Sequence, residues 1–276
     1  MLAHLLKKAF YLEEMERYPN KPFPKKKDVS QHSFEVFVIG ITLAEWEKRK
    51  FGNKINWEKL SKSLGFHDLA ESITGDILPY LKNIDRELFD QVERELVEAR
   101  LIPDLPESWR QEYTEYILNP KDDSLEGKIV AAADKLAVVE ELTKMLNYLN
   151  PEKEIYKKVT NIIEESLESL IKIDLKSCKY FLKYPLSDWD IEDLYSSDFR
   201  DYIDSLDFTK KHFENELSIS NYYLRGDIVK LESTTGVVLE KTHKDSKTIK
   251  VNLKNTGEGS YKTADIPTSL INEKCQ

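Results

Sequence analysis

The sequence predicts a mainly α-helical protein that ends in a small antiparallel β-rich module. Through most of residues 1–220, apolar residues recur at the i, i+3, i+4, i+7 spacing of amphipathic helices, in segments rich in Glu, Lys, Leu and Ala. After Tyr222 the apolar period changes to two, which is typical of half-buried strands. We therefore expect a helical domain over residues 1–220 and a β-rich accessory domain over residues 221–276, folded as an SH3-like barrel or a ribbon.

The helices follow the apolar periodicity in order. A first amphipathic helix covers residues 34–44, and a second helical segment starts near residue 60 and runs into the Phe66-His67 dipeptide. Prolines and lysines predict a loop over residues 19–27, after which Asp28 and Ser30 are candidate helix caps. Further helices are expected over residues 86–100, 106–118, 124–148, 152–172 and 201–217.

Three or four short strands are expected in the C-terminal region, three of them over residues 226–231, 236–240 and 248–253. Short segments rich in Thr, Gly, Asp, Ser and Asn separate them and are typical of turns. Antiparallel strands can be joined by such tight turns, whereas parallel strands need a longer crossover. The spacing therefore favours an antiparallel barrel or ribbon.

Composition limits the class of protein. The 276 residues are 40% hydrophobic and 33% charged, with 9 Gly and 10 Pro, which excludes collagen-like, low-complexity and mostly disordered chains. No apolar run reaches the ~18–20 residues needed to cross a bilayer, and the first residues do not resemble a secretory signal. A net charge of -9 argues against bulk attraction to nucleic acid or anionic membrane. With only Cys178 and Cys275, we expect a cytoplasmic protein without a disulfide framework.

Acidic side chains gather around one of the five histidines. His67 is followed at once by Asp68, and Glu71 lies on the same helix face as both. Asp76 follows a glycine a few residues later, and Asp134 interrupts a run of alanines inside a predicted helix. Burying the Asp134 charge without a partner would be costly, and a metal ion is one available partner.

A metal site of this kind would suit a transition-metal ion. Imidazole and carboxylate ligands together favour divalent Mn, Fe, Co or Zn. With His32 as a second histidine, two histidines and two aspartates leave open coordination positions, as a catalytic site requires. Such an ion would lower the pKa of a bound water and polarise a phosphoryl oxygen.

The order of these residues resembles a known signature. His32, then His67-Asp68, then Asp134 is similar to the H…HD…D pattern of HD-domain metal phosphohydrolases. Within that superfamily, residues 67–77 resemble the HD-x-x-E-x-x-TGD block of the YfbR-like 5'-deoxynucleotidases.

The resemblance covers about residues 10–185 and implies an all-helical HD-domain fold. It implies that the two histidines and two aspartates of the signature ligate one divalent metal ion. It also implies a homodimer that releases phosphate from deoxyribonucleoside 5'-monophosphates.

The same resemblance assigns roles to further residues. Arg17-Tyr18 matches an Arg-aromatic pair that contacts phosphate and sugar, although the family's aromatic residue is commonly Trp, so the preference for a 2'-deoxy sugar stays open. Lys82 matches a phosphate-contacting lysine by position. Glu71 and Asp76 correspond to the acid/base pair that orients water and serves the leaving oxygen.

Each assignment has a structural alternative. His32 could be a helix-entry residue, and Asp134 could pair with a lysine from another helix. Glu71 could be a solvated helix residue, Asp76 could merely close a turn, and Arg17 could be a surface cation at a helix end.

Two alternative functions use the same residues. The first is a dNTP triphosphohydrolase, which would release inorganic tripolyphosphate instead of orthophosphate. The second is a non-catalytic regulatory protein whose HD pocket senses a nucleotide. In that case the C-terminal module, which could bind an unknown partner, would pass on the signal.

Overall fold

The computed structural model describes residues 2–19, 23, 26–77, 84–189, 191–206 and 208, together with five strands between residues 228 and 275. The chain divides into two units, Met1–Asp207 and Phe208–Gln276. Among the described residues, no helix is both long and apolar enough to cross a membrane.

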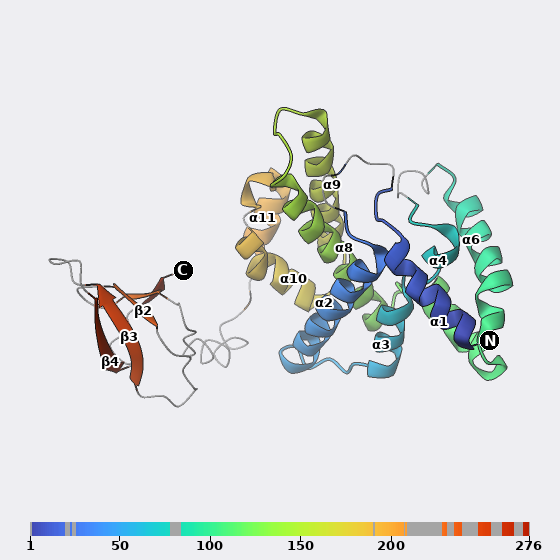
Figure 1. Cartoon of the computed structure of the whole chain (residues 1–276), viewed down its shortest axis with the longest axis horizontal. Helices are drawn as coiled ribbons and strands as arrows, with labels where there is room; N and C mark the ends of the chain where they lie inside the picture. Colours follow the sequence, from blue (N-terminus) through green and yellow to red (C-terminus); the bar gives the residue numbers. More distant parts are fainter. Residues whose placement is uncertain are drawn as a thin grey trace. The chain divides into compact units, whose positions relative to one another are not determined.

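The first unit is built from α-helices and short 3-10 turns (Figure 1). Its α-helices are α1 (Leu2–Tyr11), α2 (Val29–Arg49), α3 (Trp57–Phe66), α4 (Glu71–Thr74), α6 (Arg86–Arg100), α7 (Arg110–Leu118), α8 (Leu125–Leu146), α9 (Glu154–Ile171), α10 (Lys176–Lys183) and α11 (Ser197–Ser205). The 3-10 turns are η1 (Leu12–Glu14), η2 (Ile102–Asp104), η3 (Glu107–Trp109), η4 (Pro185–Trp189) and η5 (Glu192–Leu194).

Most expected helices are present with small shifts at their ends. The expected start of the last helix, residue 201, is wrong: Ser196 caps α11 by accepting a hydrogen bond from the Phe199 amide, so the helix begins at Ser197. α11 ends at Ser205, and most of the remainder of the expected 201–217 segment lies outside the described residues.

Side-chain caps fix where the two central helices begin. Asp28 caps α2 by accepting a hydrogen bond from the Gln31 amide at 2.8 Å, whereas Ser30 lies inside the first turn and donates to Asp28. Ser124 caps α8 by accepting from the Gly127 amide at 3.1 Å. Each cap satisfies one of the unpaired amides of a helix start, so α2 and α8 begin at defined positions.

The main core lies where α2, α3, α8 and α9 pack together. Leu43 of α2, Leu136 of α8 and Ile163 of α9 are fully buried there. α2 and α3 approach closely at Gly40, where an added Cβ would lie 2.5 Å from Cδ2 of Leu64. This tight crossing sets α2 against the end of α3.

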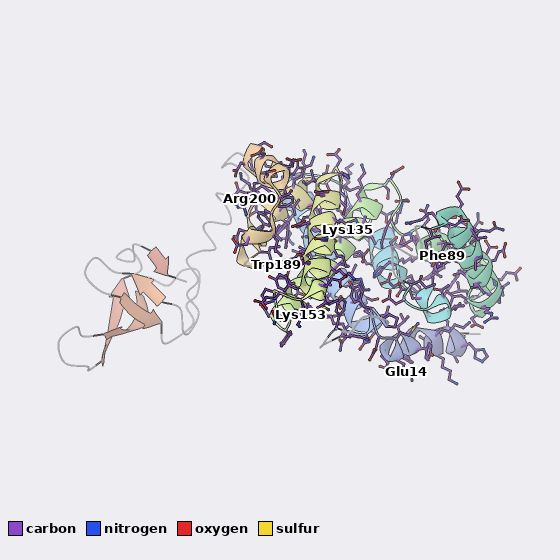
Figure 2. The ribbon with its side chains drawn as sticks, turned by 90° about the horizontal axis from the view of Figure 1, so that it is seen from above. Glu14, Phe89, Lys135, Lys153, Trp189 and Arg200 are labelled. Atoms are coloured by element: carbon purple, nitrogen blue, oxygen red, sulfur yellow. The ribbon has the colours of Figure 1, made fainter. Side chains whose placement is uncertain are left out.

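Two views show the central place of α8 within the helical unit. α6, which carries Phe89, and α11, which carries Arg200, lie toward opposite ends of this unit (Figures 1 and 2). Lys135 marks α8 between them (Figure 2). α8 also packs directly against α2, so residues of these two helices can meet in the interior.

The second unit contains an antiparallel sheet with the strand order β4-β3-β2-β1-β5. Its strands are β1 (Ile228–Lys230), β2 (Thr235–Val238), β3 (Thr248–Lys254), β4 (Tyr261–Pro267) and β5 (Glu273–Cys275). The first three overlap the three ranges expected from the sequence, and no range was given in advance for the last two. β3 and β4 pair over their full length, from Thr248 opposite Pro267 to Lys254 opposite Tyr261.

Candidate metal centre

His67 is held by the end of α3. Its Nδ1 lies 2.9 Å from the carbonyl oxygen of Leu64, and because a carbonyl oxygen can only accept, this nitrogen carries the proton. In the neutral ring, Nε2 then presents a lone pair, which is the form that binds a metal. Nε2 lies 3.0 Å from Oδ2 of Asp68, the next residue in the turn between α3 and α4.

His32 brings α2 to the same place. It lies in the first turns of α2 and is fully buried. Its Nε2 lies 3.0 Å from Oδ1 of Asp134 on α8 and 3.7 Å from Oδ2 of Asp68. The structure therefore brings all four expected ligands together, with the His32 and His67 ring centroids 6.0 Å apart.

The side-chain atoms of three of these residues are arranged as a metal ion requires. One ligand atom from each of His32, His67 and Asp68 lies within 4.8 Å of the other two. Among the described residues, Nε2 of His67 and Oδ2 of Asp68 are buried and have no partner with hydrogen-bond geometry. Buried polar atoms are rarely left without a partner, and imidazole nitrogen with carboxylate oxygen is a donor set for divalent transition metals.

Neighbouring groups favour the ionised form of both aspartates. Burial opposes the charge of Asp134, but Lys121 and His32 hold the pKa of this carboxyl well below its usual value. Burial likewise opposes the charge of Asp68, and His67 lowers its pKa in the same way. The pKa of His67 is raised because the Asp68 charge outweighs the effect of burial.

Asp134 also pairs with a lysine, as the structural alternative for this residue expected in part. Nζ of Lys121 donates to Oδ2 of Asp134 at 2.6 Å, while Oδ1 faces His32. The lysine comes from the segment between α7 and α8, whereas the alternative placed it on another helix. The Asp134 carboxylate thus contacts His32 with one oxygen and Lys121 with the other.

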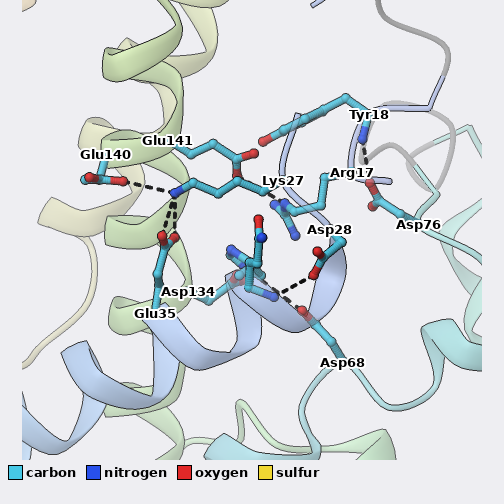
Figure 3. A network of polar contacts seen from close by, with 12 residues as sticks. Arg17, Tyr18, Lys27, Asp28, Glu35, Asp68, Asp76, Asp134, Glu140 and Glu141 are labelled. Atoms are coloured by element: carbon cyan, nitrogen blue, oxygen red, sulfur yellow. Dashed lines mark hydrogen bonds and ion pairs between the residues drawn. The ribbon is translucent and has the colours of Figure 1, made fainter. Parts of the chain in front are cut away.

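Arg17 and Tyr18 lie in the turn after η1 and are both buried (Figure 3). Nε of Arg17 donates to Oε2 of Glu141 on α8 at 3.1 Å, so this arginine is not a surface cation. The Tyr18 amide donates to Oδ2 of Asp76 at 2.8 Å, so Asp76 does more than close its own turn. Burial raises the pKa of Tyr18 to about 12, which keeps its hydroxyl protonated.

Of the two remaining expected residues, Glu71 and Lys82, the structure describes only the first. Glu71 is half-buried as the first residue of α4, and its charge contributes to the raised pKa of Lys121, so the two groups lie near each other. Lys82 lies outside the described residues.

Sequence reasoning did not select Lys121 or Glu141. Glu141 lies seven residues after Asp134 on α8, and this two-turn spacing places both on one helix face, which was a usable signal. Lys121 lies in a connecting segment without periodicity, so no sequence pattern points to it.

The helical unit resembles a class of solved proteins. It is similar to the crystal structure of an HD-domain phosphohydrolase from Listeria innocua, with a TM-score of 0.58 and 26% identity over 69% of this chain and 89% of that chain. A Pyrococcus horikoshii protein is similar with a TM-score of 0.52 and 25% identity, over 69% of this chain and 99% of that one. The fold and the His-His-Asp cluster thus define an HD-domain phosphohydrolase, a metal-dependent class of enzyme.

A family model identifies this chain more narrowly than the class of HD-domain phosphohydrolases does. The family model described as 5'-deoxynucleotidase YfbR-like matches residues 4–189, and the chain belongs to this family. A 5'-deoxynucleotidase of Vibrio vulnificus is 26% identical over 162 residues, which are 58% of this chain and 81% of that protein. The Escherichia coli 5'-deoxynucleotidase YfbR is 25% identical over 136 residues, which are 49% of this chain and 68% of that protein.

Proposed function

We propose that this protein removes phosphate from (deoxy)nucleoside 5'-monophosphates in a metal-dependent reaction. The observation that carries the proposal is the meeting of His32, His67, Asp68 and Asp134 in a chain of the YfbR-like family. Three separate helical segments supply these side chains, so their convergence depends on the fold of the whole unit.

We infer that the four side chains hold one divalent transition-metal ion, either Mn, Co, Zn or Fe. The mixed nitrogen and oxygen donor set supports this inference, as do the buried atoms of His67 and Asp68 that have no partner with hydrogen-bond geometry among the described residues. When bound, such an ion supplies Lewis-acid chemistry, because it lowers the pKa of water and polarises a phosphoryl oxygen.

The remaining residues act on substrate and protons. Arg17 binds phosphate oxygens, and its nearness to Asp68 supports this role, because the Asp68 charge contributes to the raised pKa of Arg17 against the effect of burial. Tyr18 meets the sugar, and Lys82 is assigned a second phosphate contact. Glu71 orients the attacking water and accepts its proton, and Asp76 serves the leaving oxygen.

The test is a product analysis on metal-stripped protein to which Mn, Co, Zn or Fe is added back. Nucleoside and orthophosphate from dNMPs are the expected products, and the ratio of dNMP to NMP turnover measures what Tyr18 accepts. Tripolyphosphate from dNTPs would instead establish a triphosphohydrolase. Tight nucleotide binding without any turnover would establish a sensor.

A matched pair of variants ties the activity to the site. Asp68→Ala should abolish both metal retention and turnover. Asp174→Ala is the control, because this aspartate pairs with Lys179 and its side chain is 83% exposed. A fully active, metal-free Asp68→Ala protein would contradict the proposal.

We further propose a cytoplasmic homodimer with domains over residues 1–220 and 221–276, the second an SH3-like barrel or ribbon that binds an unknown partner. The division between Asp207 and Phe208 supports two domains. Phe34 and Val38, one turn apart on α2, are 70% and 48% exposed, which supports an apolar contact between copies.

Analytical ultracentrifugation of the whole protein tests the homodimer. Deletion of residues 222–276, with circular dichroism to verify folding, tests whether turnover needs the second domain.

A further inference from the structure

Lys121 lies in a segment that the next residue holds against α3 and the start of α8. The next residue, Asp122, accepts a hydrogen bond from Nζ of Lys59 on α3 at 2.6 Å and from the Ser124 amide at 3.1 Å. The segment also packs directly on the start of α8, where a Cβ on Gly127 would collide with the backbone of Asp122. Lys121 is therefore attached to a backbone that has little freedom to move.

The Lys121 ammonium stands beside the metal ligands and remains accessible. It donates to Oδ2 of Asp134 at 2.6 Å, while the side chain is 38% exposed. Arg17, another cation that the proposed function places at the site, has a side chain only 9% exposed, and its Nε is engaged by Glu141. An ammonium has three N–H donors, and Asp134 is the one hydrogen-bond partner of Lys121 among the described residues.

A cation at this position suits the charge of the centre. Nζ of Lys121 lies 2.6 Å from Oδ2 of Asp134, and Nε2 of His32 lies 3.0 Å from Asp134 and 3.7 Å from Asp68, so two carboxylates face this part of the site. A phosphate monoester brings further negative charge into the same space. A positive group next to the ligand carboxylates would lower the repulsion and donate to a phosphate oxygen.

We propose that Lys121 is a substrate-binding residue that donates a hydrogen bond to a non-bridging oxygen of the substrate phosphate. This inference rests on the proposed function. Asp134 keeps the ammonium at the metal ligands with one donor, and the remaining donors are available to the phosphate. The rival role is purely structural: Lys121 would only neutralise Asp134 and never meet the substrate.

The experiment compares Lys121→Met with Lys179→Met on metal-loaded protein. Lys179 forms a similar ion pair with Asp174 at 2.8 Å on α10, outside the site, and serves as the control. Three quantities are measured: metal bound per chain, kcat and KM for a dNMP, and the inhibition constant of inorganic phosphate. Loss of one charge-assisted hydrogen bond should lower kcat/KM by about 10- to 100-fold. Phosphate inhibition should weaken by a similar factor, with metal content unchanged.

The outcomes separate the two roles. Lys121→Arg keeps the positive charge and should recover part of the phosphate affinity. Unchanged phosphate inhibition in Lys121→Met would overturn the proposal. The proposal would also be overturned if Lys121→Met lost its metal and excess metal restored both metal binding and full activity. If the wild-type protein hydrolyses no dNMP, calorimetric binding of inorganic phosphate still tests Lys121. The proposed function and this inference can then fail separately.

Discussion

The ion pair between Arg17 and Glu141 offers the sharpest test of how the site is held together. Arg17 is 7% exposed and Glu141 is 3% exposed, so Glu141→Gln leaves the arginine charge buried without its compensating carboxylate. Breaking one side of a buried ion pair costs about 3–5 kcal/mol, and the remaining amide oxygen favours the lower end of that range. For a unit of this size, about 3 kcal/mol corresponds to a decrease in Tm of roughly 6–12 °C.

Glu140→Gln is the matched control, measured in the same calorimetric melts. Glu140 is the neighbouring residue, pairs with Lys27 at 3.2 Å and has a side chain 22% exposed, so its loss should cost no more than about 1 kcal/mol. Equal destabilisation by the two variants would refute the reasoning. The double variant Arg17→Met/Glu141→Met removes both charges of the pair and should recover stability relative to Glu141→Gln, but not phosphate binding.

Further predictions concern close packing and metal binding. Gly127→Ala should destabilise the helical unit more than Gly40→Ala in thermal melts. The Cβ at Gly127 meets the backbone of Asp122, whereas the Cβ at Gly40 meets the side chain of Leu64, which can shift. Chelation should lower the Tm of the metal-loaded wild-type protein, because a ligand bound only to the folded state stabilises it, and should leave Asp68→Ala unaffected.

The helices, and the residues that meet at the candidate site, could be picked out because their signals are local. The expected helix over residues 86–100 coincides with α6, and Asp28 caps α2 as expected. The pair His67-Asp68 is adjacent in the chain, and Asp134 was conspicuous as a charge among alanines. Each of these features is contained in a few consecutive residues.

What could not be predicted depends on packing between distant segments. Lys121 meets Asp134 only because Asp122 fixes its segment against α3 and α8, and no pattern in residues 119–124 announces this. Arg17 and Glu141 are 124 positions apart, so their ion pair exists only once the turn after η1 is placed against α8. Sequence periodicity describes which face of a helix is apolar, but not which polar groups meet across the core.

Asp76 shows how such a meeting changes the expected role of a residue. It was expected to act as an acid or base, and its Oδ2 accepts the Tyr18 amide at 2.8 Å. Tyr18 has a φ of 53°, a conformation that is costly for a residue other than Gly, so this hydrogen bond stabilises the turn that carries Arg17. Asp76→Asn keeps an acceptor oxygen and should lower kcat with little change in KM, whereas Asp76→Ala should also raise KM. Equal KM values for the two variants would show that Asp76 does not hold the turn.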